Sequence, residues 1–170
     1  MAVEQAGFRK DRSSMQQILM LRLIAETAKR RKKIIYNCFI DFQKAFDLVK
    51  QNITWATLES YGVGNRLTQI LKDIGERSHA AVKTGKEIGE WFPTTIGTRQ
   101  GHPLSLCLFI TYQETEMDGV QDNGTGITVQ RERINNLRFA DGMNMIEESL
   151  DQLRENVGEL EKTGSKAGLK

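Results

Sequence analysis

The chain has 170 residues, a formal net charge of +2, 39% apolar residues and 27% charged residues, a mix typical of a soluble globular domain that buries a core. No apolar run reaches about 18 residues, so no membrane span is expected, and the N-terminus lacks the apolar stretch of a secretory signal. We therefore expect an intracellular protein, in the cytoplasm or nucleus, and not a secreted one.

The N-terminal quarter predicts a helix followed by a buried strand. Ser14 with Gln17 three residues later resembles a capping box, and apolar residues at helical spacing follow. This pattern predicts a helix over residues 14–31. Residues 34–40 are mostly apolar and rich in β-formers, which predicts a buried central strand that ends at Asp41.

Two more helices are expected next, over residues 52–61, ended by Gly62, and over residues 65–77. The second has apolar residues at helical spacing, which predicts a buried stripe formed by Leu67, Ile70, Leu71 and Ile74.

The second half of the chain predicts short strands and two helices. Residues 80–84 and 90–96 are expected to form two strands around a glycine-containing turn, and a helix should start near Pro103. Three further strands are predicted over residues 126–130, 134–140 and 143–146. Ser149 would begin the last helix. This mixture of helices and short antiparallel strands predicts an α/β or α+β layer fold.

Charge is unevenly distributed along the chain. Residues 1–40 carry nine Lys/Arg and three Asp/Glu, whereas residues 141–170 carry four Lys/Arg and seven Asp/Glu. The densest basic run, residues 29–33, could bind a polyanion. The run alone favours another interpretation, a solvated helix end whose cations interact well with the helix dipole.

The two cysteines, Cys38 and Cys107, both lie within apolar runs. They are expected to be buried free thiols in a reducing compartment, and not a disulfide or a zinc site.

Two carboxylates occupy positions where a metal ion could bind. Asp41 follows directly after the predicted strand, where a carboxylate is costly unless it reaches solvent or binds a cation. Asp141 lies in the sequence Phe139-Ala140-Asp141-Gly142, and Asp-Gly is a strong hairpin signal. Together the acids could hold Mg²⁺, which prefers oxygen ligands. These residues alone favour the simpler alternative, in which one acid caps a helix and the other only forms a turn.

A glycine-flanked basic loop lies between the two acids. Residues 97–105 read GTRQGHPLS and run into the predicted helix start at Pro103. Such a loop can place main-chain N–H groups and Arg99 beside phosphates or a base.

Several segments, in this order, resemble reverse transcriptases. FIDFQKAFD at residues 39–47 resembles the first motif of the polymerase palm, RQGHPLS at residues 99–105 the motif that packs against template and nucleotide, and FADG at residues 139–142 the aromatic-Ala-Asp-Asp hairpin. QAGFRKDRSS at residues 5–14 resembles the fingers segment of retrotransposon and group II intron enzymes, usually with Gly where Asp11 stands. INNLRFAD and the closing GLK are also similar to that family.

The chain is therefore similar over its whole length to the reverse transcriptase domain of a non-long-terminal-repeat, LINE-type retrotransposon. The resemblance implies a polymerase palm, an antiparallel sheet backed by helices, with part of the fingers. Residues 1–170 are expected to form this partial domain without the thumb or an endonuclease domain.

The resemblance implies that dNTPs are added to a DNA primer on an RNA template with two Mg²⁺ ions. Asp41 and Asp141 would be the catalytic metal ligands, and the main-chain carbonyl of Phe42 would help to hold a metal.

The resemblance also implies roles in substrate binding. Phe46 would be the steric gate that rejects a ribose 2′-OH, and Gln100 and Gly101 would lie near the template base and the nucleotide. Arg9 and Arg99 would contact the template, the primer or the triphosphate.

Three departures from the family pattern bear on activity. Gly142 stands where the second hairpin Asp is expected, His102 where Cys is common, and Leu106 where Pro is common. The competing interpretations are a palm with residual nucleotidyl transfer, an inactive nucleic-acid-binding remnant, and a structural domain without a nucleic-acid role. Gly142 and the expected lack of a thumb favour the second interpretation over the first for this chain, and the basic front segment and Arg99 argue against the third.

Overall fold

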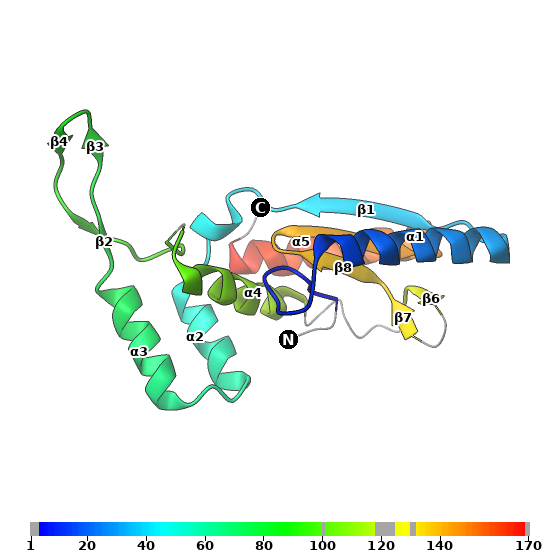
Figure 1. The fold of residues 1–170 in the computed structure, drawn as a ribbon, viewed down its shortest axis with the longest axis horizontal. Coiled ribbons are helices and arrows are strands. Elements are labelled where there is room, and N and C mark those ends of the chain that lie inside the picture. The colour runs from blue at the N-terminus through cyan, green and yellow to red at the C-terminus, as the bar shows by residue number, and fades with distance from the viewer. Residues whose placement is uncertain (1–3, 100, 118–124, 130–131, 169–170) are drawn as a thin grey trace. The chain divides into compact units, whose positions relative to one another are not determined.

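The computed structural model describes residues 4–99, 101–117, 125–129 and 132–168 (Figure 1). The chain forms two compact units. Unit 1 contains the described residues of Met1–Ala45 and Gln113–Lys170, and unit 2 is Phe46–Tyr112. Among the described residues, no helix has the length and apolar character needed to cross a membrane.

Unit 1 is built on a three-stranded antiparallel sheet with strand order β1-β9-β8. Strand β1 (Tyr36–Asp41) pairs with β9 (Gly142–Glu147), and β9 also pairs with β8 (Asn136–Phe139). The register places Asp41 opposite Gly142. The predicted antiparallel sheet is confirmed, and the FADG segment forms the hairpin between its last two strands.

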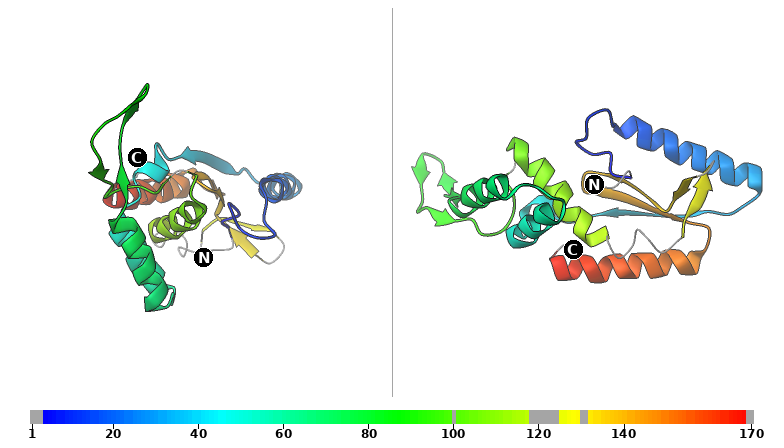
Figure 2. Two further views of the ribbon diagram at one scale, coloured as in Figure 1. Left: turned by 60° about the vertical axis from the view of Figure 1, so that its left-hand side comes forward. Right: turned by 90° about the horizontal axis from the view of Figure 1, so that it is seen from below.

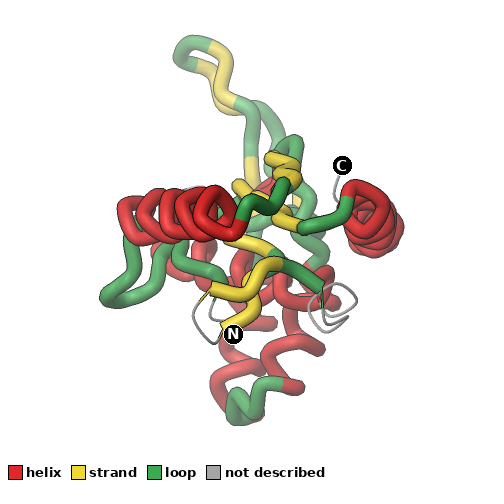
Figure 3. The backbone as a smooth tube through the Cα atoms, turned by 90° about the vertical axis from the view of Figure 1, so that its right-hand side faces the viewer, coloured by secondary structure: helices red, strands yellow, loops and turns green. Residues whose placement is uncertain are grey.

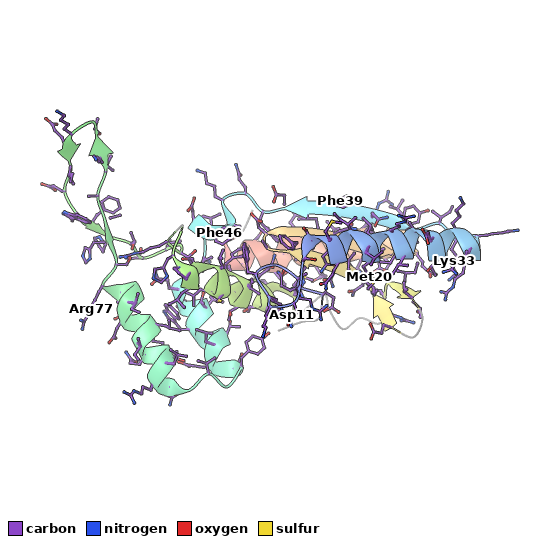
Figure 4. All side chains as sticks on the ribbon, in the orientation of Figure 1. Asp11, Met20, Lys33, Phe39, Phe46 and Arg77 are labelled. Carbon is purple, nitrogen blue, oxygen red and sulfur yellow. The ribbon has the colours of Figure 1, made fainter. Side chains whose placement is uncertain are left out.

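The prediction of a buried central strand over residues 34–40 is wrong in position and burial. The central strand is β9, and β1 lies at the sheet edge. Half-buried and exposed residues alternate along β1, and Phe39 is 72% exposed. A mostly apolar run is typical of a strand covered on both faces. Here one face of β1 stays open around Phe39 (Figure 4).

Helices α1 (Ser14–Arg31) and α5 (Leu150–Ala167) lie on opposite faces of this sheet, as Figures 2 and 3 show. Helices therefore cover both faces of the sheet. Helix α1 begins as predicted, but its capping box is formed by Ser13 with Gln16, one residue earlier than the Ser14 pattern indicates.

The apolar core of unit 1 lies between α1, the sheet and a small hairpin. The hairpin consists of β6 (Ile127–Val129) and β7 (Glu132–Ile134). The buried core residues are Ile24, Ala28, Ile127, Ile134, Leu137 and Ile146. The predicted strand over residues 126–130 is confirmed as β6, except that residue 130 lies outside the described residues.

Unit 2 contains helices and two short hairpin-like pairings. The elements that lie wholly within it are α2 (Gln51–Ser60), α3 (Asn65–Glu76), β2 (His79–Ala80), β3 (Lys83–Thr84), β4 (Glu87–Ile88) and β5 (Phe92–Pro93). The short 3-10 helix η1 (Ala45–Asp47) and helix α4 (Pro103–Met117) each begin or end in unit 1. The predicted helices are confirmed to within about a residue at each end. The predicted strand over residues 80–84 is divided into β2 and β3, whereas the predicted strand over residues 90–96 contains only β5, because β4 precedes it. Strand β2 pairs with β5, and β3 pairs with β4 around Gly85.

Two expectations about burial are corrected. The apolar stripe of α3 is largely exposed, since Leu67, Ile70 and Ile74 are 53%, 48% and 47% exposed. The helical spacing correctly predicts one apolar face, but the described chain does not cover it. Cys107 is an exposed free thiol rather than a buried one, and Cys38 is a half-buried free thiol.

Candidate active site

The sheet register brings the two predicted metal ligands to one end of unit 1. Asp41 is the last residue of β1 and lies opposite Gly142, the first residue of β9. Asp141 directly precedes Gly142. Opposed Cα atoms in an antiparallel pair are about 4.5–5.5 Å apart, so the two acids start from neighbouring main-chain positions. Asp41 is exposed and Asp141 is half-buried.

The turn that carries Asp141 differs from the predicted one. Phe139 pairs with Gly142, so the two turn residues are Ala140 and Asp141. Ala140 has the left-handed φ of 55°, whereas Gly142 is not among the described glycines with positive φ. The Asp-Gly signal is therefore one residue out of register, and the turn does not depend on the conformational freedom of Gly142.

A groove of about 320 Å³ lies beside the acids. Helix α1 provides Ile18 and Leu21, and the sheet provides Phe39, Phe139 and Asp41. The groove between α1 and the sheet thus has apolar residues beside the acidic end of the sheet, so a ligand there can meet both kinds of surface.

The oxygen donors at this end suit a hard divalent cation, which prefers carboxylate and carbonyl ligands. Asp41, Asp141 and the main-chain oxygen of Phe42, which directly follows Asp41, are the available donors from unit 1. Within the described residues, no group of three or more His, Cys, Asp or Glu side chains could hold a metal. The two carboxylates and the carbonyl are oxygen ligands of the kind that such a cation prefers, and Gly142 stands where the family pattern has a third acid.

The whole chain, residues 1–170, matches the family model described as reverse transcriptase (RNA-dependent DNA polymerase). The chain belongs to the reverse transcriptase family. The predicted resemblance is confirmed, and members of this family generally use divalent metal ions.

A curated relative supports the retrotransposon assignment. The domain is 25% identical over 150 residues to the retrovirus-related Pol polyprotein from type-1 retrotransposable element R2 of Nasonia vitripennis. This match covers 88% of the chain but only 14% of the relative.

Solved telomerase structures share the fold of this reverse transcriptase domain. Apo telomerase from Candida tropicalis superposes with a TM-score of 0.70 at 12% identity, over 98% of this chain and 31% of that one. Telomerase from Candida albicans, in complex with a TWJ fragment of telomeric RNA, superposes with a TM-score of 0.68 at 13% identity. That match covers 92% of this chain and 29% of the telomerase chain. The predicted palm with part of the fingers is confirmed as a fold.

In unit 2 of the reverse transcriptase domain, Phe46 and the basic loop are joined by main-chain contacts. The Phe46 carbonyl accepts a hydrogen bond of 2.9 Å from the Thr98 N–H, and the Phe46 ring packs on Phe109 with centroids 4.4 Å apart. At Gly97, where φ is 86°, a Cβ would come 2.9 Å from the Asp47 carbonyl oxygen. The loop therefore packs closely along the segment that carries Phe46.

Arg99 is held in unit 2 by hydrogen bonds to its neighbours. Its Nε donates to Ser78 Oγ at 2.8 Å, and its carbonyl accepts from Ser105 Oγ at 2.6 Å. Gly101 has φ 83° and open space around it, and Gln100 lies outside the described residues. In unit 1, Arg9 donates from Nη1 to the Gln5 carbonyl at 3.0 Å.

Sequence reasoning missed two buried polar features of unit 1. Gln5 is fully buried and bonds the turn that carries Asp141. Arg138 in β8 is also fully buried and lies 3.4 Å from Glu114 of α4. Both Gln5 and Arg138 occur in segments that match the family, but nothing in their spacing distinguishes them from exposed polar residues.

Proposed function

We propose that this domain adds dNTPs to a DNA primer on an RNA template, with Asp41 and Asp141 as ligands of Mg²⁺. The observation that carries the proposal is the pairing of Asp41 with Gly142, which brings the acid at the end of β1 beside the hairpin acid. The match of the whole chain to the reverse transcriptase family supports the reaction class.

Different residues of the chain would have different roles in nucleotidyl transfer. Bound divalent ions would supply charge stabilisation for the attacking primer oxygen and the leaving pyrophosphate. Asp41 and Asp141 would fix those ions, and the groove along Phe39 and Phe139 lies where a substrate can approach them. Phe46 would limit space at the sugar, and Arg99 would provide positive charge near nucleotide or template.

Gly142 makes the proposed metal site weaker than one with a third acid. Each carboxylate adds charge and an oxygen ligand, and ligand charge tunes the affinity of a site for a divalent cation. We expect slow primer extension or none, with the fold preserved.

The test is primer extension on an RNA template with Mg²⁺ or Mn²⁺. The matched variants are Asp41→Asn, Asp141→Asn and the control Asp151→Asn, an exposed acid in the first turn of α5. Extension that is lost in the first two and kept in the control supports the proposal. Extension that survives both site variants refutes it.

The steric-gate role of Phe46 has its own test. If Phe46 excludes the ribose 2′-OH, Phe46→Val should raise rNTP incorporation relative to dNTP incorporation, because a smaller side chain leaves room for the hydroxyl. An unchanged ratio in an active variant would remove Phe46 from this role.

A second candidate function is nucleic-acid binding without catalysis. It is favoured by Gly142 and by the lack of a three-acid group among the described residues. A gel shift on RNA–DNA primer–template separates the candidates: salt-sensitive binding with no extension in either metal supports the binding module.

A further inference from the structure

A buried glutamine, distant in sequence, contacts the turn that carries Asp141. Gln5 is 0% exposed. Its Oε1 accepts from the Ala140 N–H at 3.2 Å, and its Nε2 donates to the Ala140 carbonyl at 3.3 Å. One side chain thus binds both main-chain polar groups of the residue directly before Asp141.

The Gln5 amide is itself held in one orientation. Its Oε1 also accepts from the Gly7 N–H at 2.7 Å, and its Nε2 donates to Gln113 Oε1 at 2.8 Å. Turning the amide over would place its NH₂ against two N–H donors. The contacts with Ala140 therefore have one favourable arrangement.

The main chain around Gln5 reinforces this contact. Ala6 N–H donates to the Arg138 carbonyl at 2.9 Å, and Arg138 N–H donates to the Glu4 carbonyl at 3.1 Å. Gly7 approaches so closely that a Cβ there would lie 2.2 Å from the Ala140 nitrogen. Residues 4–7 thus lie along the edge of β8 and reach the turn.

The turn needs such support because of Ala140. Its φ of 55° is left-handed, a conformation that residues with a Cβ rarely adopt unless the surroundings determine it. If the turn relaxed, the main chain of Asp141 would rotate and its carboxylate would leave the end of the sheet beside Asp41.

We propose that Gln5 is a positioning residue that holds the Ala140–Asp141 turn in the conformation required for metal binding. This inference rests on the proposed role of Asp141 as a metal ligand. Gln5 does not touch the metal; it acts through the main chain of Ala140.

The matched pair of variants is Gln5→Leu and Asn156→Leu. Both replace a buried amide with an apolar side chain of similar size. Asn156 is 2% exposed and bonds Glu147 Oε1 at 2.7 Å, at the end of β9 away from Asp141. Asn156→Leu therefore measures what loss of a buried amide does to unit 1 without touching the turn.

Two readouts are needed, Mn²⁺ affinity from electron paramagnetic resonance of free Mn²⁺ and amide hydrogen exchange of Ala140 by NMR. Gln5→Leu should weaken Mn²⁺ binding by about tenfold or more, as is common when a residue that orients a ligand is removed. It should also speed exchange at Ala140. Asn156→Leu should change neither, whatever its effect on melting temperature.

A rescue variant separates positioning from general destabilisation. Glycine adopts a left-handed φ without strain, so Ala140→Gly in the Gln5→Leu background should recover part of the missing Mn²⁺ affinity. If Gln5→Leu does not fold, Gln113→Leu removes only the anchor of the Gln5 amide. Gln113→Leu should then weaken Mn²⁺ binding by less than the tenfold expected for Gln5→Leu, and it should speed amide hydrogen exchange at Ala140.

The outcomes are distinguishable from failure of the proposed function. If Asp141→Asn binds Mn²⁺ as tightly as the unmodified chain, or if that chain binds none, the metal role of Asp141 fails and this inference fails with it. If Asp141→Asn abolishes binding while Gln5→Leu, or Gln113→Leu in its place, binds Mn²⁺ normally, only the positioning role of Gln5 is overturned.

Discussion

Gly142 lies directly opposite Asp41 in the antiparallel pairing of β9 with β1. A Cβ at Gly142 would meet the Phe139 carbonyl oxygen at 3.4 Å, an ordinary contact, and Gly142 does not have the left-handed φ that excludes side chains. This position can therefore accept the carboxylate that the family pattern places there.

Gly142→Asp should tighten Mg²⁺ binding by about tenfold, equivalent to about 1.4 kcal/mol. The added acid contributes charge beside Asp41, so without metal the two acids should repel and lower the melting temperature. Saturating Mg²⁺ should restore it, because a ligand that binds the folded state stabilises it. Calorimetric titration and melting with and without Mg²⁺ measure both effects. Gly142→Asn is the uncharged control, and equal affinities for both variants would place this hairpin away from any metal site.

Gly7→Ala should destabilise the domain, because its Cβ would overlap the Ala140 main chain. Overpacking of this kind typically costs about 1–3 kcal/mol in the free energy of unfolding. The control is Gly158→Ala, in α5, where a Cβ has open space. It should stabilise the helix by about 0.5–1 kcal/mol. Urea denaturation compares them, and equal stability of both variants would contradict the close approach at Gly7.

The buried ion pair of Arg138 and Glu114 should behave as a coupled unit. Their side chains are 0% and 4% exposed, so removing one charge takes a close counter-charge away from a group that stays buried. Glu114→Gln or Arg138→Met alone should each lower the free energy of unfolding by about 3–5 kcal/mol. The double variant should cost clearly less than the two single effects added together. Additive costs in a double-mutant cycle would show that the pair is not energetically coupled.

Nucleic-acid binding should depend on the basic end of α1. Arg31 donates to the Thr128 carbonyl and Lys33 pairs with Glu148, whereas Lys29, Arg30 and Lys32 are exposed cations of the same run. Replacing these three with Gln should weaken binding to primer–template. The slope of log K against log salt should fall by about 0.7–0.9 for each phosphate that the variant no longer neutralises.

The control for that experiment keeps the charge, with Lys29→Arg and Lys32→Arg. It should bind nearly as tightly as the unmodified chain. If the neutral variant binds with the same affinity and slope as this control, the basic run is only a solvated helix end.

Sequence reasoning succeeded where local chemistry determines structure. Helical spacing and end signals located α1, α2 and α3 to within about a residue or two, and the ordered motifs identified the family. The apposition of Asp41 with the Asp141 hairpin also followed from the motifs, because each acid lies at a predicted strand end.

It failed where distant segments decide the outcome. An apolar run cannot reveal whether β1 lies in the middle of a sheet or at its edge, since that depends on which strands pair with it. The turn lies one residue earlier than the Asp-Gly signal predicts, because residues 4–7 bind Ala140. This contact over a long sequence separation outweighs the local Asp-Gly preference. Gln5 was unrecognisable for the same reason.

The pairing of β1 with β9 has a consequence for the order of folding. These partner strands are separated in sequence by the whole of unit 2, which is one continuous segment, Phe46–Tyr112. Closing a long loop costs chain entropy before any contact repays it, and topologies with distant contacts fold slowly. The local helices of unit 2 should therefore form first, and the acidic end of the sheet should assemble among the last parts of the chain. During synthesis on a ribosome, Asp41 would emerge long before β9, and strand β1 would stay without this partner strand until β9 is synthesised.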